Sequence, residues 1–326
     1  MTHLPKPAAK AAPVPAPRRH DARQCTRSLL IVGAAAALLS GCSWLPSLPS
    51  FGGNDKAGSD GLPRKEFIQA VTSSNVLIRF NAGQPAKLLA SQALKGLQAG
   101  ETLLGIDYRI AKGQLYGLGS TGRLYRINTD SAVATPVGVP LPFGLTGSEF
   151  GVDFNPTVDR LRVVSNTGMN FRIHPDTGAL VDARPDLDGT QLDGVPVFAA
   201  GDNNAGVPPA LMAAAYTYNK QDEKITTNYA IDGSTRSLVT QGTLEGTTPM
   251  VSPNTGRLYT VGPLGVPPFS RASFDISDLN NAAYAALSNG DEGGTRFMEI
   301  NLKTGAAKEI GRVVAGMTLR GIAIEP

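Results

Sequence analysis

The stretch from Phe150 to Leu180, F-G-V-D-F-N-P-T-V-D-R-L-R-V-V-S-N-T-G-M-N-F-R-I-H-P-D-T-G-A-L, decides the fold. It contains short runs in which apolar residues alternate with others, and Asn, Pro, Asp and Gly separate these runs. Alternation over a few residues between turn-forming residues is typical of β-strands. The stretch therefore predicts consecutive strands joined by tight turns.

The same plan recurs along the chain between Glu66 and Pro326, which indicates a repeat protein. One recurring element ends a strand with a residue that can cap the following turn, at Asn81, Asn128, His174, Asp232 and Asn301. A Gly- and Ala-rich element precedes it, as L-G-I-D-Y-R from Leu104, F-G-V-D-F-N from Phe150, A-A-A-Y-T-Y-N from Ala213, A-S-F-D-I-S from Ala272 and R-G-I-A-I-E from Arg320. We expect this second element to form innermost strands, where several sheets crowd together.

Four strands in about 45–50 residues is the repeat of a β-propeller, so the sequence predicts an all-β propeller. Five copies of the inner strand predict five blades. The last copy has no strands after it, and strands starting at Phe67, Asn75 and Ala86 can complete its blade. We expect the N-terminal strands to close the ring with the C-terminal strand and to remove its exposed edges.

A sixth blade is the alternative. V-S-P-N-T-G-R-L-Y-T-V, from Val251 to Val261, matches the hairpin that begins at Phe154. The residues from Gly262 to Arg271 include three prolines and are poorly suited to supply two more strands. Five blades are therefore the preferred prediction.

Several runs resemble a known family: G-L-Q-A-G-E-T-L-L-G-I-D, G-Q-L-Y-G-L-G-S-T-G-R-L-Y, F-N-P-T-V-D-R-L-R-V-V-S and A-A-G-D-N-N-A-G. They are similar to the bacterial domain of unknown function 4394, over nearly everything after residue 65. The resemblance implies a secreted or envelope propeller-like domain. It brings no established activity and no catalytic residues.

The N-terminal segment has the pattern of a bacterial lipoprotein signal. Four arginines precede an apolar run over residues 28–39, and Ser40, Gly41 and Cys42 follow it. The run is too short to span a bilayer as a stable helix. An ordinary signal peptide or a short membrane anchor is the alternative. Ser43 after the cysteine is typical of lipoproteins sent to an outer membrane, if the cell has one.

These features divide the chain into three parts. Residues 1–41 are predicted to be a signal peptide, 42–65 a lipidated Cys42 with a Pro-, Gly- and Ser-rich flexible tether, and 66–326 the propeller. The predicted location is the cell envelope, as an outer-membrane lipoprotein on its periplasmic or surface face. The predicted membrane contact is the N-terminal lipid.

Composition excludes several classes of function. Removing the six Lys and Arg and the one Asp before Cys42 from totals of 30 and 27 leaves 24 and 26, a net charge of −2. No basic field remains that would favour nucleic acid. The second cysteine, Cys25, lies in the predicted signal, so we expect no disulfide and no thiolate metal site in the mature chain.

Histidine chemistry is poorly supported. His174 is the one histidine after the predicted signal, and its repeat equivalents are Asn and Asp, which favours a turn-capping role. Schemes that need a catalytic histidine or several histidine ligands are therefore disfavoured.

Acidic residues are the remaining candidates. Asp107, Asp153 and Asp275 share one position on three inner strands and can converge at the channel as a calcium site, whereas Tyr216 and Ala323 break the ring. Bonding of each aspartate to a neighbouring backbone is the structural alternative. The acidic loop 181–204 offers a second calcium candidate at Asp186, Asp188 and Asp193, with a solvated loop as its alternative. Arg79, Arg126 and Arg172 recur on third strands and predict a solvated outer stripe rather than an anion-binding ladder.

The leading functional hypothesis is a non-catalytic, envelope-anchored scaffold that binds a protein, glycan or small-molecule ligand at its channel mouth. It requires no cofactor, although calcium fits the carboxylates. The alternative is a calcium-dependent hydrolase of lactonase type that uses the channel carboxylates. A propeller fold alone does not choose between them.

Overall fold

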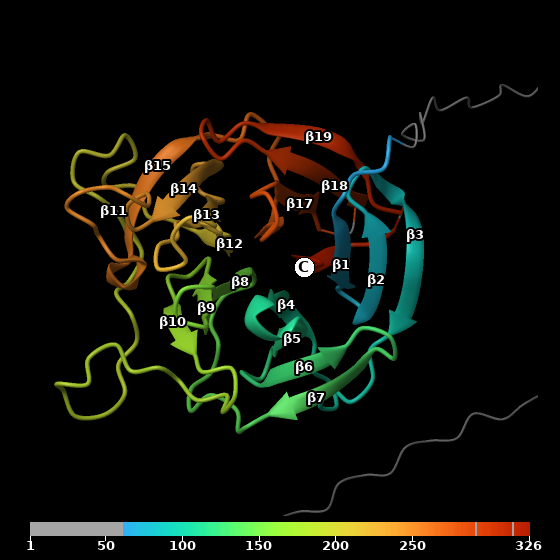
Figure 1. Ribbon diagram of the computed structural model, residues 1–326, viewed down its shortest axis with the longest axis horizontal. Coiled ribbons are helices and arrows are strands. Elements are labelled where there is room, and N and C mark those ends of the chain that lie inside the picture. Colours follow the sequence, from blue (N-terminus) through green and yellow to red (C-terminus); the bar gives the residue numbers. More distant parts are fainter. Residues whose placement is uncertain (1–60, 291, 315) are drawn as a thin grey trace, which may run out of the picture. The chain divides into compact units, whose positions relative to one another are not determined.

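The computed structural model describes residues 61–290, 292–314 and 316–326, so the predicted signal, Cys42 and most of the tether lie outside the described residues. The described residues form five small β-sheets and two short 3₁₀ helices, η1 (Ile110–Lys112) and η2 (Pro253–Thr255). The sheets are arranged as the blades of a propeller around one axis (Figure 1). The prediction of five blades is confirmed.

From the axis outward, blade 1 contains β20 (Leu319–Ile324), β1 (Phe67–Thr72), β2 (Val76–Asn81) and β3 (Gln84–Ala93). Blade 2 contains β4 (Leu103–Arg109), β5 (Gln114–Gly119), β6 (Leu124–Asn128) and β7 (Val133–Val137). Blade 3 contains β8 (Phe150–Asn155), β9 (Arg160–Ser165) and β10 (Asn170–Ile173). Blade 4 contains β12 (Leu211–Tyr216), β13 (Asn228–Asp232), β14 (Ser237–Gln241), β15 (Arg257–Pro263) and β11 (Val197–Phe198), and blade 5 contains β16 (Arg271–Ile276), β17 (Ala283–Asn289), β18 (Glu292–Ile300) and β19 (Ala307–Arg312).

The ring closes as predicted, because the C-terminal strand and the N-terminal strands share blade 1. β20 pairs antiparallel with β1, and the register brings Ala70 opposite Ile322. Side chains add to this closure. Glu325 accepts hydrogen bonds from both Arg79, at 2.7 Å, and Gln69, at 2.8 Å. Within the described residues, pairing of β20 with β1 therefore leaves no open edge between these two strands.

Two blades differ from the predicted four strands. In blade 3 the chain leaves the sheet after β10 and makes only an isolated bridge between Ile173 and Leu180. The loop that follows supplies β11, which pairs in parallel with β15 as a fifth strand of blade 4. Residues 251–261 do not form a sixth blade, because η2 and β15 complete the outer part of blade 4.

Small residues allow the inner strands to meet at the axis. A Cβ on Gly151 would lie 2.5 Å from the backbone nitrogen of Ala214, and one on Gly321 would lie 2.8 Å from that of Ile106. The cavity enclosed by the inner strands has a volume of only about 10 Å³. The predicted crowding is therefore correct, and the centre of the ring is packed rather than open.

Apolar side chains fill the spaces between blades. The described residues contain five buried clusters, one at each interface between neighbouring blades. At the interface of blades 5 and 1, for example, the ring of Phe80 packs edge-on against that of Phe297 at 5.2 Å between centroids. This alternation of sheets and apolar layers holds the inner strands at fixed positions.

The predicted turn residues have their expected roles. Each accepts a hydrogen bond from a backbone N–H in its turn, namely Asn81 from Gly83, Asn128 from Ser131, His174 from Asp176, Asp232 from Thr235 and Asn301 from Lys303. The repeat therefore preserves a capping function with several residue types.

Candidate functional site

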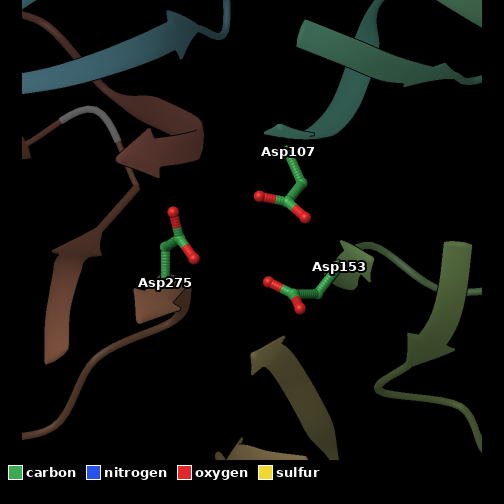
Figure 2. A group of neighbouring side chains, drawn as sticks. All are labelled: Asp107, Asp153 and Asp275. Carbon is green, nitrogen blue, oxygen red and sulfur yellow. The ribbon is translucent and has the colours of Figure 1, made fainter. Parts of the chain in front are cut away.

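Three aspartates from three blades converge near one end of the axis. Asp107 lies on β4, Asp153 on β8 and Asp275 on β16, and each offers a carboxylate oxygen within 4.8 Å of the others. Figure 2 shows their carboxyl groups pointing toward a common space. All three are buried, with exposed fractions of 3%, 2% and 5%. We call this group the axial aspartates.

Each axial aspartate also ties its strand to the next blade. Asp107 accepts a hydrogen bond from the backbone N–H of Phe154 at 2.7 Å, Asp153 from Tyr216 at 2.9 Å, and Asp275 from Ile324 at 2.6 Å. A hydrogen bond from a backbone N–H partly replaces the hydration that a carboxylate loses on burial. The structural role expected from the sequence is therefore present, alongside the convergence.

These bonds correct one detail of the predicted ring. Phe154 on β8 and Ile324 on β20 each lie one residue after the aspartate position of their strand, and each donates its backbone N–H to an axial aspartate. Tyr216 on β12 donates in the same way, so it is equivalent to Phe154 and Ile324. Ala215 therefore occupies the aspartate position in blade 4, and it pairs with Tyr229 as Asp107 pairs with Tyr116. The residues that interrupt the ring of carboxylates are Ala215 and Ala323.

Burial and mutual repulsion disfavour the ionised forms of the axial aspartates. Burial, followed by the nearby charge of Asp275, raises the pKa of Asp107 well above its usual value. Burial, followed by the charges of Asp107 and Asp275, raises the pKa of Asp153 well above its usual value. Burial raises the pKa of Asp275 to about 7. At neutral pH the group must therefore retain protons or bind a cation.

The chain beyond β12 and β16 forms a rim beside the axial aspartates. The backbone N–H of Tyr218 donates to Asn281 Oδ1 at 2.8 Å, and Asn281 Nδ2 donates to the Tyr218 carbonyl at 2.9 Å. Burial, and then the charges of the three aspartates, raise the pKa of the Tyr218 hydroxyl. Burial also raises the pKa of Asp278, although Lys220 acts in the opposite direction.

A further polar group at the axis lacks a partner. Ser273 lies two residues before Asp275 on β16, so both side chains are on the same face of that strand. Its hydroxyl oxygen is buried without a hydrogen-bond partner, and Ser273 lines the axial cavity. Buried polar atoms normally find a partner in protein, water or an ion. None of the axial aspartates lines this cavity of about 10 Å³, so the Ser273 hydroxyl is a separate polar group along the axis.

The residues of the predicted loop calcium site are not brought together. Among the described residues, the axial aspartates are the one group of three or more His, Cys, Asp or Glu side chains close enough to share a metal. Asp186 instead pairs with Arg184 at 2.7 Å. Asp193 turns inward and pairs with Arg162 at 3.0 Å.

The pairing of Asp193 belongs to a buried polar cluster that sequence reasoning missed. Arg162 has a side chain exposed by only 1%, and it bonds to Asp193, Asn170 and Tyr216. Arg172 also pairs with Asp193, at 2.8 Å. The predicted arginine stripe is thus only partly solvated, because Arg126 is exposed whereas Arg79 and Arg172 are engaged in ion pairs.

The comparisons with known proteins identify the class and the family. The fold defines the chain as a five-bladed β-propeller with a buried acidic axis. The model of the domain of unknown function DUF4394 matches residues 76–323, and the chain belongs to this family. No curated protein matches it.

Two solved structures are distant neighbours. A structural genomics protein of unknown function from Bacteroides thetaiotaomicron VPI-5482 has a TM-score of 0.38 and 15% identity, over 76% of this chain and 58% of that one. The dihydro-heme d1 dehydrogenase NirN in complex with DHE has a TM-score of 0.34 and 12% identity, over 84% of this chain and 47% of that one. The chain thus spans about half the length of each. Within the described residues, no helix has the length and apolar character needed to cross a membrane.

Proposed function

We propose that this protein is a non-catalytic binding propeller of the cell envelope, anchored through Cys42, and that its axial aspartates hold a divalent cation. Calcium is the first candidate, because it prefers oxygen ligands and tolerates irregular geometry. The observation that carries the proposal is the convergence of three buried carboxylates from separate blades.

Electrostatics supports a cation at this position. Three oxygens up to 4.8 Å apart can each lie about 2.8 Å from a common centre, close to the roughly 2.3–2.6 Å of calcium–oxygen bonds. No salt bridge from Lys or Arg reaches the axial aspartates among the described residues. A divalent cation would relieve repulsion that otherwise keeps protons on these groups.

A binding role has more support than hydrolysis. The axial aspartates are at most 5% exposed, which leaves little carboxylate surface for a substrate. A metal-dependent hydrolase needs an open coordination position for water or substrate. The calcium-dependent hydrolase of lactonase type therefore remains the second hypothesis, and it shares the same proposed cation.

Calorimetric titration of the full chain, purified in mild detergent, tests the cation proposal. We expect CaCl₂ to bind with a dissociation constant of about 10⁻³ M or tighter. The Asp153→Asn variant keeps the shape of the side chain but removes a charge, and its affinity is expected to fall at least about tenfold. Asp130→Asn is the matched control, because Asp130 is exposed on blade 2.

The absence of binding heat in the wild type, or an unchanged affinity in Asp153→Asn, would refute the cation site. Hydrolysis of a lactone panel is followed in the same samples. Calcium-dependent turnover that Asp153→Asn abolishes would favour the hydrolase over the binding role.

The anchor has a separate test, because it rests on the N-terminal sequence. Cells that express the full chain are grown with an alkyne analogue of palmitate. We expect the label on the wild-type protein and no label on Cys42→Ser, because serine lacks the thiol that accepts the lipid. Equal labelling of both proteins would contradict anchoring at Cys42.

A further inference from the structure

A group of lysines lies at the outer edge of blades 5 and 1, close to the point where the described chain begins. Its members are exposed, and each lies near the turn that follows β2 or β18: Lys65, Lys87, Lys303 and Lys308. We call these four residues the basic edge. The outer strands of the two blades, β3 and β19, are neighbours in the ring (Figure 1).

Contacts within the fold gather three of these lysines around one salt bridge. Arg64, the residue before Lys65, donates to Glu299 on β18 at 2.9 Å. Glu299 lies opposite Lys308 in the pairing of β18 with β19, and the turn between these strands contains Lys303. The three lysines therefore come from separate segments but share one part of the surface.

Lys87 joins the same surface because the outer strands of the two blades touch. A Cβ on Gly311 of β19 would lie 3.1 Å from Cγ of Pro85, which is two residues before Lys87 on β3. Two apolar side chains close to the lysines in the chain are also exposed, Leu62 by 88% and Leu89 by 46%. The surface therefore combines cations with a few apolar groups.

The acidic side chains of this region are already paired with arginines. Glu299 pairs with Arg64 at 2.9 Å, and Glu309 pairs with Arg312 at 3.9 Å. Within the described part of the chain, no lysine of the basic edge forms a salt bridge. The basic edge therefore carries excess positive charge, although the chain after the predicted signal has a net charge of −2.

Negative charge collects across the ring. The loop 181–204 contains five aspartates and one arginine. It leads from blade 3 to blade 4, on the side of the ring away from β3 and β19 (Figure 1). An anionic surface would attract the basic edge and repel this loop, so it would orient the whole propeller.

From this arrangement we infer that the basic edge docks the propeller on a membrane surface of anionic phospholipids. The negative potential of such a surface attracts lysines within a Debye length, about 8 Å at physiological ionic strength. Exposed leucines such as Leu62 can enter the boundary between headgroups and acyl chains and add apolar burial.

The place where the chain enters the propeller favours a membrane over another anionic partner. The inference rests on the proposed anchoring through Cys42, and the segment from Cys42 reaches the described propeller at Gly61. The Gly61 carbonyl accepts a hydrogen bond from Gln84, at the start of β3, at 2.9 Å. An anchor joined at this point brings the basic edge, rather than the acidic loop, toward the lipid.

Lysine labelling on vesicles tests the docking. The full chain is reconstituted into vesicles of phosphatidylcholine, or of phosphatidylcholine and phosphatidylglycerol in equal parts, and is acetylated with a membrane-impermeant N-hydroxysuccinimide ester. Peptide mass spectrometry gives the rate at each lysine. We expect the basic edge to react at least about fivefold more slowly on the anionic vesicles, because each lysine beside an anionic surface favours the docked state about fivefold.

Three exposed lysines on blades 2 and 4 are internal controls, and their rates are expected to be alike on both kinds of vesicle: Lys112, Lys220 and Lys224. Raising the salt from about 0.1 M to about 1 M shortens the Debye length from about 10 Å to about 3 Å and should abolish the protection.

A charge-reversed variant adds a second test. In Lys87→Glu/Lys308→Glu, the remaining lysines of the basic edge are expected to react at the same rate on both kinds of vesicle. Lys112→Glu/Lys224→Glu changes the net charge equally and should behave like the wild type, since both residues lie on other blades.

Equal rates at the basic edge on neutral and anionic vesicles would overturn the inference. Protection that persists on neutral vesicles or at high salt would also overturn it, because it would indicate a contact other than one with lipid charge. The palmitate label reports the anchor separately. A labelled Cys42 with an unprotected basic edge removes only the docking, and a protected basic edge without the label removes only the anchor.

Discussion

Asp193 and Asp153 are both buried aspartates, but the charges around them differ. Asp193 faces two arginines, with 3.0 Å to Arg162 and 2.8 Å to Arg172. Asp153 faces other carboxylates, and it accepts a hydrogen bond from the backbone N–H of Tyr216. A buried ion pair stabilises a fold when both partners are present and destabilises it strongly when one is removed. Asp193 therefore has a structural role, whereas the cation proposed at the axial aspartates would supply Asp153 with the opposite charge that its carboxylate neighbours do not provide.

The first prediction at the residue scale concerns Asp193. Asp193→Ala leaves Arg162 buried without its anion, and we expect the free energy of unfolding to fall by about 3–5 kcal/mol. Urea unfolding followed by circular dichroism measures this loss. Asp186→Ala is the control from the same loop, because its ion pair with Arg184 is exposed, and little change is expected. A similar small effect for both variants would contradict the assignment.

The sequence was sufficient to predict some residues of the site but not others. The axial aspartates were recognisable because they recur at one position of a repeat. The buried ion pairs of Asp193 could not be recognised, because its partners Arg162 and Arg172 come from β9 and β10, outside its own loop. The assignment of Tyr216 to the aspartate position was wrong because an Ala-rich strand has no Asp or Gly to fix its alignment.

At the scale of elements, the inner strands determine how closely the blades approach. Alternating apolar residues between turn residues predicted these strands, although strands that are buried on both faces, as β4 and β12 are, favour continuous apolar and small residues instead. The outer part of blade 3 could not be predicted in this way. Its run around Leu180 resembles the other outer strands, but the chain departs there and β11 pairs with the distant β15.

The element-scale prediction is a substitution on β8. Gly151→Ala places a Cβ 2.5 Å from the Ala214 nitrogen, a backbone atom that can move only if β12 moves. We expect a loss of about 2–3 kcal/mol in the free energy of unfolding, as for an overpacked core. Gly144→Ala is the control, since a Cβ there meets nothing within 4 Å. Equal urea midpoints for the two variants would show that the inner strands are not in tight contact.

At the scale of the whole molecule, ring closure brings distant residues to one axis. Asp107 and Asp275 meet because β20 pairs with β1 and the blades then form a complete circle. Five copies of one element were enough to predict this closure. The repeat indicated crowded inner strands, but it could not indicate that the cavity between them is as small as about 10 Å³, because that volume depends on how the side chains of all five inner strands pack together.

The burial of Asp275 in the closed ring predicts that stability depends on pH. The pKa of Asp275 is about 7 in the folded chain, against an ordinary value of 3.8. A raised carboxyl pKa gives stability that is complete below the ordinary value and is lost as the pH rises through the folded value. Without a cation, the propeller should therefore weaken between about pH 4 and pH 8, and a bound divalent cation should remove this loss.

The most direct test of the axial site is the melting temperature of the full chain in EDTA and in CaCl₂ between about pH 5 and pH 8. The predicted result is a fall in EDTA as the pH rises through about 7, no such fall in calcium, and no benefit from calcium in Asp153→Asn. Melting curves that coincide in EDTA and calcium at every pH would contradict a cation site at the axial aspartates.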